Sequence, residues 1–138
     1  MPSDDSRALA LLSRTPYGRV SASRRALPFT AVTRHIVTGG RVVLRLHRGY
    51  GYHRALDGSV VAYEADNANS GAPDTWSVQV TGTARTTEPA AAERELFGRT
   101  PRLADGDPFD PVFLRIDPEF VTLHHLTDVP VAAYAHPL

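Results

Sequence analysis

Hydrophobic and polar residues alternate with a period of two along much of this chain. The clearest case is the segment 75–87, TWSVQVTGTARTT, in which every second residue from Trp76 to Ala84 is apolar or glycine and the residues between them are polar. Successive side chains of a β-strand point to opposite faces, so this pattern predicts a strand with one buried face and one polar face.

Other segments have the composition of strands and are separated by turn residues. The sequence Thr38-Gly39-Gly40 predicts a hairpin turn, because glycine tolerates the positive φ that tight hairpins need. Besides 75–87, the predicted strands are 17–23, 27–37, 41–48, 59–68, and finally 112–117 and 120–126, which are interrupted at Pro118 and form one strand or a strand pair.

Three segments have helical rather than alternating patterns. The first begins near Ser3, a suitable N-cap, and ends before Pro16. Residues 88–98 have a proline near the first turn and a glycine at the end, which is typical of a helix. Residues 52–56 can form one or two helical turns, and the tail 130–138 has no classifiable pattern.

The order of these elements favours a mainly β protein. About six or seven strands follow one another through short turns, with only two or three short helices and no helix after each strand. Such a series is typical of an antiparallel barrel or sandwich rather than a doubly wound sheet. A chain of 138 residues fits a single domain, 1–138.

The charge balance argues against a polyanionic partner. The chain has 15 basic and 15 acidic residues, and its arginines are scattered, so we expect no nucleic-acid binding. It has no cysteine, which excludes disulfides and thiolate chemistry. The first residues are acidic and precede a short apolar stretch, the reverse of a secretory signal, and no apolar run is long enough to span a membrane. We therefore expect a soluble, cytoplasmic protein with no membrane partner.

Basic side chains gather at the end of the predicted third strand. Arg45 and His47 are two positions apart and so lie on one face of that strand. The turn RGYGYHRALDG then adds Arg48, His53 and Arg54. Guanidinium groups beside the free backbone N–H groups of a glycine turn can bind an anion. The same residues are also compatible with a solvated strand end and turn, so both interpretations remain open.

Two further features have structural and functional interpretations. Trp76 lies on the apolar face of its strand, where it can pack in a core or interface or stack on a planar ligand. His124 and His125 are adjacent, so on a strand they point to opposite faces and cannot chelate one ion together. We predict no metal site.

Taken in order, the segments TPYGRVSAS, LPFTAV, RVVLRLHR, VVAYEAD, WSVQVTGTAR and FLRIDPEFVT resemble a known family. It is the pyridoxamine 5′-phosphate oxidase-like, flavin-binding split-barrel family, in its compact actinobacterial type. The resemblance covers roughly residues 7–127. It implies a six-stranded antiparallel split β-barrel that forms a homodimer, with FMN or a deazaflavin bound in clefts at the dimer interface.

The resemblance also implies positions for the cofactor. The ring would rest against the second strand near Pro28 and Thr30, and the phosphate would lie at the end of the third strand and in the following turn. Relatives commonly have a phosphate-binding lysine where this chain has Tyr52, which donates a hydrogen bond but carries no charge. The predicted cofactor-binding residues are Pro28, Thr30, Arg45, His47, Arg48, Tyr52, His53, Arg54 and Trp76, the last lining the cleft or the interface.

The function implied is that of a flavin- or deazaflavin-dependent oxidoreductase acting on a small organic substrate. The cofactor would carry the reactivity, so no catalytic side chain is assigned. The tyrosine in place of the lysine motivates two alternatives on the same fold. One is a non-redox binding protein, with haem as a candidate ligand, whose cleft is refitted by Tyr50, Tyr52 and His53. The other is a cofactor-independent enzyme that uses His53 and Tyr52 as acid and base.

Overall fold

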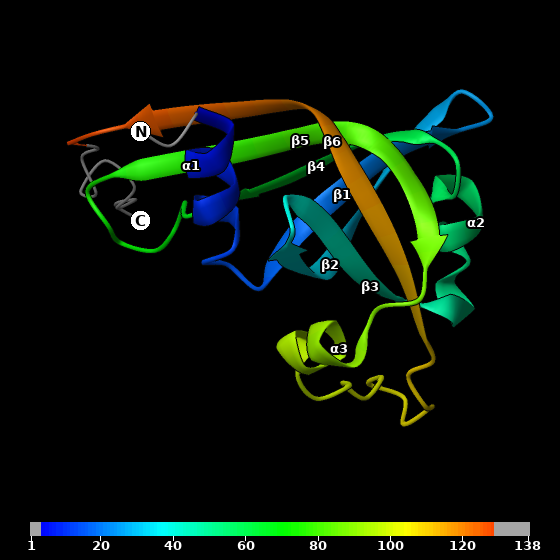
Figure 1. Ribbon diagram of the computed structural model, residues 1–138. Helices are drawn as coiled ribbons and strands as arrows, with labels where there is room; N and C mark the ends of the chain where they lie inside the picture. The colour runs from blue at the N-terminus through cyan, green and yellow to red at the C-terminus, as the bar shows by residue number, and fades with distance from the viewer. Residues whose placement is uncertain (1–3, 129–138) are drawn as a thin grey trace, which may run out of the picture.

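A closed barrel of antiparallel strands forms the body of the protein (Figure 1). The computed structural model describes residues 4–128, so the predicted cap at Ser3 and the tail 130–138 lie outside the described residues. In that range six strands close in the order β1-β2-β3-β6-β5-β4. Their bounds are β1 Tyr17–Arg24, β2 Leu27–Thr38, β3 Arg41–His47, β4 Val60–Asp66, β5 Thr75–Thr87 and β6 Pro111–Leu126. The predicted antiparallel barrel is confirmed, and the sandwich alternative is wrong.

Short helices surround the barrel. They are α1 Asp4–Leu12, α2 Tyr52–Leu56 and α3 Ala91–Phe97, with a 3-10 turn η1 Arg48–Tyr50 before α2. In Figure 1, α1 and α2 lie at opposite ends of the barrel and α3 lies beside β2 and β3. No helix within residues 4–128 has the length and hydropathy needed to cross a bilayer.

The barrel interior contains the residues that the alternating pattern selects. On β5, Trp76, Val78, Val80 and Ala84 are all buried, and Gln79 between them is exposed. β3 differs, because it is buried on both faces. Its second face joins a smaller apolar cluster outside the barrel, formed by Ile36, Val43, Phe97 and Phe113, so α3 covers β3 from outside.

The last strand answers a question that the sequence left open. Residues 112–117 and 120–126 belong to one continuous strand, β6, with a bulge where Gly82 pairs with Pro118 and Thr81 with Phe120. Proline has no N–H to donate to a neighbouring strand. The β6 residues that pair with β3 end at Ile116, so no β3 residue beside Pro118 requires that hydrogen bond. A Cβ at Gly82 would lie 2.1 Å from the Asp117 carbonyl oxygen, so glycine permits this close approach.

A buried polar group connects α1 to the barrel. The side chain of His35 is 1% exposed; its Nε2 donates to the Leu12 carbonyl at 2.9 Å, and its Nδ1 accepts from the Tyr63 hydroxyl. Burial lowers the pKa of His35 and raises the pKa of Tyr63, in each case because desolvation disfavours the charged form. This histidine is therefore a neutral structural residue.

Candidate functional site

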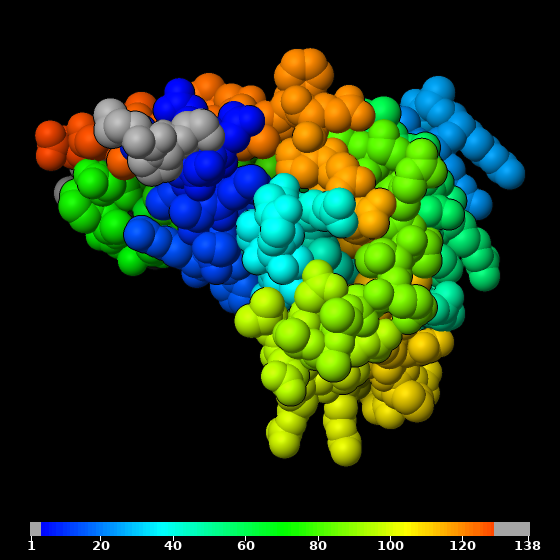
Figure 2. All heavy atoms as spheres, in the orientation of Figure 1, coloured from blue at the N-terminus to red at the C-terminus, as the bar shows by residue number. Residues whose placement is uncertain are grey.

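A cavity of about 380 Å³ lies against the outer side of β2 and β3. The turn after β3 and the segment 99–110 complete its walls; Figure 2 shows the chain around this segment projecting below the barrel. The lining residues are Tyr17, Thr30, Ala31, Val32, Thr33, Arg34, Arg45, Leu46, His47, Tyr50, Tyr52, Pro101 and Phe109.

Two arginines occupy one end of this cavity. Arg34 and Arg45 are direct partners in the β2–β3 register, and their guanidinium carbons lie 5.7 and 5.4 Å from the ring centre of Phe97. They hold the C-terminal end of α3 and the residue after it. Arg34 Nη2 donates to the Leu96 carbonyl at 2.8 Å, and Arg45 Nη1 donates to the Gly98 carbonyl at 3.2 Å.

The charge of this pair is not balanced by nearby carboxylates. Among residues 4–128, neither Arg34 nor Arg45 takes part in an ion pair. Arg45 is 6% exposed, and its Nε is buried without a hydrogen-bond partner in that range. Burial, followed by the positive charge of Arg34, lowers the pKa of Arg45. An anionic or electron-rich group in the cavity would relieve this imbalance.

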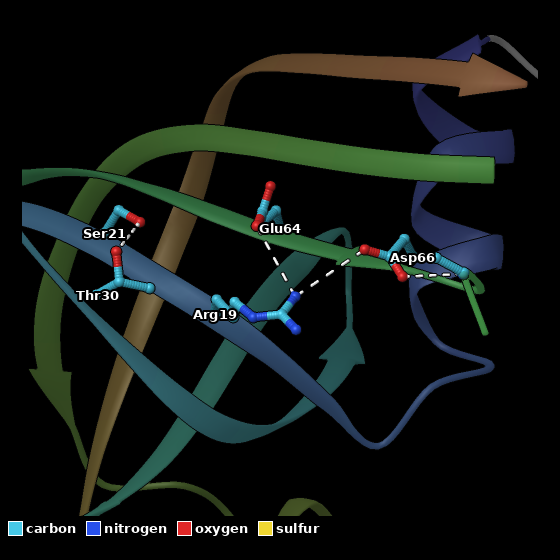
Figure 3. Close-up of polar contacts among 6 residues, drawn as sticks. Arg19, Ser21, Thr30, Glu64 and Asp66 are labelled. Carbon is cyan, nitrogen blue, oxygen red and sulfur yellow. Dashed lines mark hydrogen bonds and ion pairs between the residues drawn. The ribbon is translucent and has the colours of Figure 1, made fainter. Parts of the chain in front are cut away.

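Another arginine on the neighbouring strands shows the contrast. Arg19 on β1 lies 3.9 Å from carboxylate oxygens of both Glu64 and Asp66 on β4 (Figure 3). The same view shows Thr30, a predicted site residue, with its hydroxyl oxygen 3.1 Å from that of Ser21. Thr30 is thus positioned by β1. Arg19 is exposed and has carboxylate partners, whereas Arg45 is buried and has none among residues 4–128.

Aromatic rings form a continuous series along the cavity. His47 lies between Phe109, at 5.2 Å, and Tyr50, at 4.9 Å between ring centres. Tyr50 in turn lies 5.9 Å from Tyr52, which stacks on Phe29 at 5.5 Å with an interplanar angle of 11°. Such a wall suits a planar ligand.

The imidazole of His47 connects the end of β3 to the segment 99–110. Its Nδ1 accepts the Asp110 N–H at 3.0 Å, so in the neutral ring the proton is on Nε2. A Cβ at Gly49 would lie 2.4 Å from Nε2, so glycine permits the close approach of the turn to this imidazole. His47 therefore anchors the segment 99–110 through Nδ1 and lines the cavity with its ring.

The structure brings together part of the predicted site. Thr30, Arg45, His47 and Tyr52 line the cavity. Pro28 and Tyr52 line an adjacent depression, here called the Phe29 groove. It is formed by Arg24, Leu27, Pro28, Phe29, Tyr50, Gly51, Tyr52 and Ala55. Four predicted residues line neither: Arg48, His53, Arg54 and Trp76. The alternative of a solvated strand end is wrong for Arg45, which is buried.

The four remaining residues have other surroundings. Arg48 Nε lies 3.5 Å from an Asp110 carboxylate oxygen, and Trp76 is packed in the barrel core at 7% exposure. His53 Nδ1 is buried without a partner among the described residues, and burial lowers its pKa, assisted by Arg48 and Arg54. In a single chain, these side chains are not part of the cavity wall.

The sequence interpretation missed Arg34, Tyr17, Pro101 and Phe109. A signal for Arg34 was present, because the turn at Gly39-Gly40 fixes the hairpin register that pairs it with Arg45. No local signal could place Pro101 and Phe109, which reach the cavity from a segment distant in sequence from β2 and β3.

Comparisons with known proteins place this geometry in a family. The sequence profile described as pyridoxamine 5′-phosphate oxidase matches residues 4–125. The uncharacterized protein Rv0080 of Mycobacterium tuberculosis is 38% identical over 86 residues, a match that spans 59% of this chain and only 57% of that protein.

Solved structures share the fold at low sequence identity. The FAD binding protein from Mycobacterium smegmatis is 23% identical, with a TM-score of 0.68 over 91% of this chain and 98% of that one. The FAD and heme binding protein from the same organism is 17% identical, with a TM-score of 0.67 over 94% of this chain and 73% of that one. With a profile match over nearly the whole chain and the barrel described above, this protein belongs to the pyridoxamine 5′-phosphate oxidase family.

Proposed function

We propose that the cavity binds a flavin-type cofactor, a flavin or a deazaflavin, and that the protein is an oxidoreductase acting on a small organic substrate. The observation that carries this proposal is the uncompensated Arg34–Arg45 pair at one end of an aromatic-walled cavity. Family membership and the FAD-binding relatives from Mycobacterium smegmatis support it.

The residues fit such a cofactor in distinct ways. The strand backbone from Ala31 to Thr33 and the ring of Phe109 would hold the planar ring, with Arg34 and Arg45 at its electron-rich edge. The hydroxyl groups of the turn and of β2, which belong to Thr30, Tyr50 and Tyr52, would donate to the phosphate end. When bound, the cofactor supplies hydride transfer, and positive charge beside its ring tunes its reduction potential.

The open side of the cavity supports the predicted homodimer. Val32 and Tyr17 line the cavity and are nevertheless 69% and 53% exposed, which is unusual for large apolar side chains beside a binding site. A second copy of the chain would cover them and exclude water from the cofactor. Multi-angle light scattering tests the dimer, and a monomer at micromolar concentration would contradict it. The cytoplasmic location stays a prediction.

The two alternatives receive less support from the geometry. Haem needs an axial ligand; among residues 4–128 one histidine, His47, lines the cavity, and its Nδ1 already accepts the Asp110 N–H. The proposed acid and base, His53 and Tyr52, do not meet there, because Tyr52 lines the cavity and His53 does not.

The absorbance spectrum of the protein as purified tests the proposal, followed by mass identification of any bound ligand. We expect the absorbance bands of a flavin in the visible region or, for a deazaflavin, a single absorbance band at shorter wavelength. A colourless protein that takes up neither FMN, FAD nor a deazaflavin in titration would contradict the proposed function. A Soret band without flavin would favour the haem alternative.

A further inference from the structure

The Phe29 groove continues the cavity along the same strand. It has a volume of about 260 Å³ and shares Tyr50 and Tyr52 with the cavity. On β2, Leu27 borders the groove and Arg34 borders the far end of the cavity. Seven residue steps separate them, which span about 23 Å at 3.3 Å per residue. The two adjoining spaces together extend further along β2 than a single planar ring requires.

The groove is itself suited to a planar group. The stacked pair of Phe29 and Tyr52 forms its wall, with Pro28 and Leu27 adding apolar surface. Arg24 also lines it and forms no ion pair among residues 4–128. Figures 1 and 2 show the β1–β2 hairpin, which carries Arg24 and Leu27, projecting at the end of the barrel that carries α2.

The distribution of negative charge at the junction of the two spaces distinguishes a diphosphate bridge from a terminal phosphate. A phosphate monoester carries about 1.5 to 2 negative charges at pH 7, whereas each phosphate of a diphosphate bridge carries one. The junction residues Tyr50 and Tyr52 offer hydroxyl donors and no cation, and Arg48 is engaged by Asp110. A terminal phosphate would place its whole charge at this junction, whereas a diphosphate bridge spreads its two charges over two phosphates, the second of which would lie toward Arg24 in the groove.

We propose that the Phe29 groove holds the adenosine part of FAD, so that this protein takes the flavin dinucleotide in preference to FMN. The inference rests on the proposed function, because the flavin ring must occupy the cavity. Tyr52 is then a specificity-determining residue: its ring stacks with Phe29 beneath the base, and its hydroxyl faces the diphosphate. Arg24 at the groove supplies charge to the adenosine-side phosphate.

Binding of FAD and FMN to the cofactor-free protein, followed by flavin fluorescence, tests the proposal on the unaltered chain. We expect FAD to bind at least tenfold more tightly, since stacking of one base on aromatic side chains contributes about 5- to 150-fold in affinity. We also expect 5′-AMP to compete with FAD and not with FMN. Equal affinities, or no effect of 5′-AMP, would overturn this proposal alone. Failure of every flavin to bind would overturn the proposed function as well.

Substitutions in the groove sharpen the test. Tyr52→Lys removes the stacking partner and adds a cation for a terminal phosphate, so the preference should shift toward FMN by at least tenfold. Arg24→Gln should weaken FAD binding severalfold and leave FMN binding unchanged. Arg25→Gln, at a neighbouring exposed arginine outside the groove, is the matched control and should change neither. If Tyr52→Lys weakens both flavins equally while the circular dichroism spectrum is unchanged, Tyr52 does not discriminate between them.

Discussion

Arg45→Met separates the contribution of this arginine to stability from its contribution to ligand binding. The substitution removes hydrogen bonds to the carbonyls of Gly98 and Arg99 at 3.2 and 3.4 Å, and contacts with the rings of Phe97 and Phe109 at 5.4 and 5.9 Å. The hydrogen bonds are at or beyond the long end of the normal range, so each contributes about 1 kcal/mol at most. Each cation–π contact adds about 0.5 to 1 kcal/mol.

Most of this loss is offset in the same variant. The guanidinium is buried without a carboxylate, and its unpaired Nε costs about 1 to 3 kcal/mol, while methionine restores apolar contact with Phe97. We therefore expect the free energy of unfolding to change by no more than about 1 kcal/mol. Flavin affinity, in contrast, should fall by about 10- to 150-fold, the equivalent of one hydrogen bond to a charged group.

Urea denaturation and flavin titration on the same preparations measure both quantities. Arg41→Met is a suitable control, because Arg41 lies on the same strand and pairs with Asp117 away from the cavity. The control should leave flavin affinity unchanged. A destabilisation of about 3 kcal/mol or more with unchanged affinity would show that Arg45 is a structural residue and would refute this reasoning.

Three further predictions concern the barrel and its surface. Because burial holds the pKa of His35 below its unfolded value, the native state binds fewer protons; thermal stability should be constant above the unfolded pKa of about 6.5 and decline as the pH falls below it. His124→Gln, at an exposed histidine, should leave that pH dependence unchanged, and a flat profile in the wild type would contradict a buried neutral His35. Gly82→Ala places a Cβ 2.1 Å from the Asp117 carbonyl oxygen and should lower the free energy of unfolding in urea by about 1 to 3 kcal/mol or more; an unchanged midpoint would show that the bulge relaxes freely. Val32→Glu should yield monomers in light scattering with unchanged circular dichroism, whereas a persistent dimer would place the interface elsewhere.

The strands were predictable where local pattern and tertiary environment agree. The segment 75–87 was predicted with its observed bounds because its period of two coincides with one buried face. The sequence did not show whether Pro118 interrupts the last strand. A proline is acceptable in a strand only where the adjacent strand needs no N–H from it. At Pro118 this depends on where the pairing with β3 ends. The continuity of β6 is therefore set by its pairing with strands that are distant in sequence.

The candidate site was predictable where local sequence pattern determines which residues lie together. Arg45 was selected by its position on β3, and the hairpin turn already implied its partner, Arg34. Helix α3 encloses these two strand arginines at the end of the cavity, because its Phe97 lies against both of them. The position of a helix on a sheet depends on packing between segments far apart in sequence, and no local pattern near β3 specifies it.

The proposed flavin-type cofactor would occupy the cavity between β2, β3 and the segment 99–110. A crystal structure of the protein saturated with FAD tests it most directly. We expect planar electron density against residues 30–34, with the guanidinium groups of Arg34 and Arg45 within hydrogen-bond distance of the ligand. Density for the flavin at any other place on the barrel, or an empty cavity at saturating FAD, would contradict it.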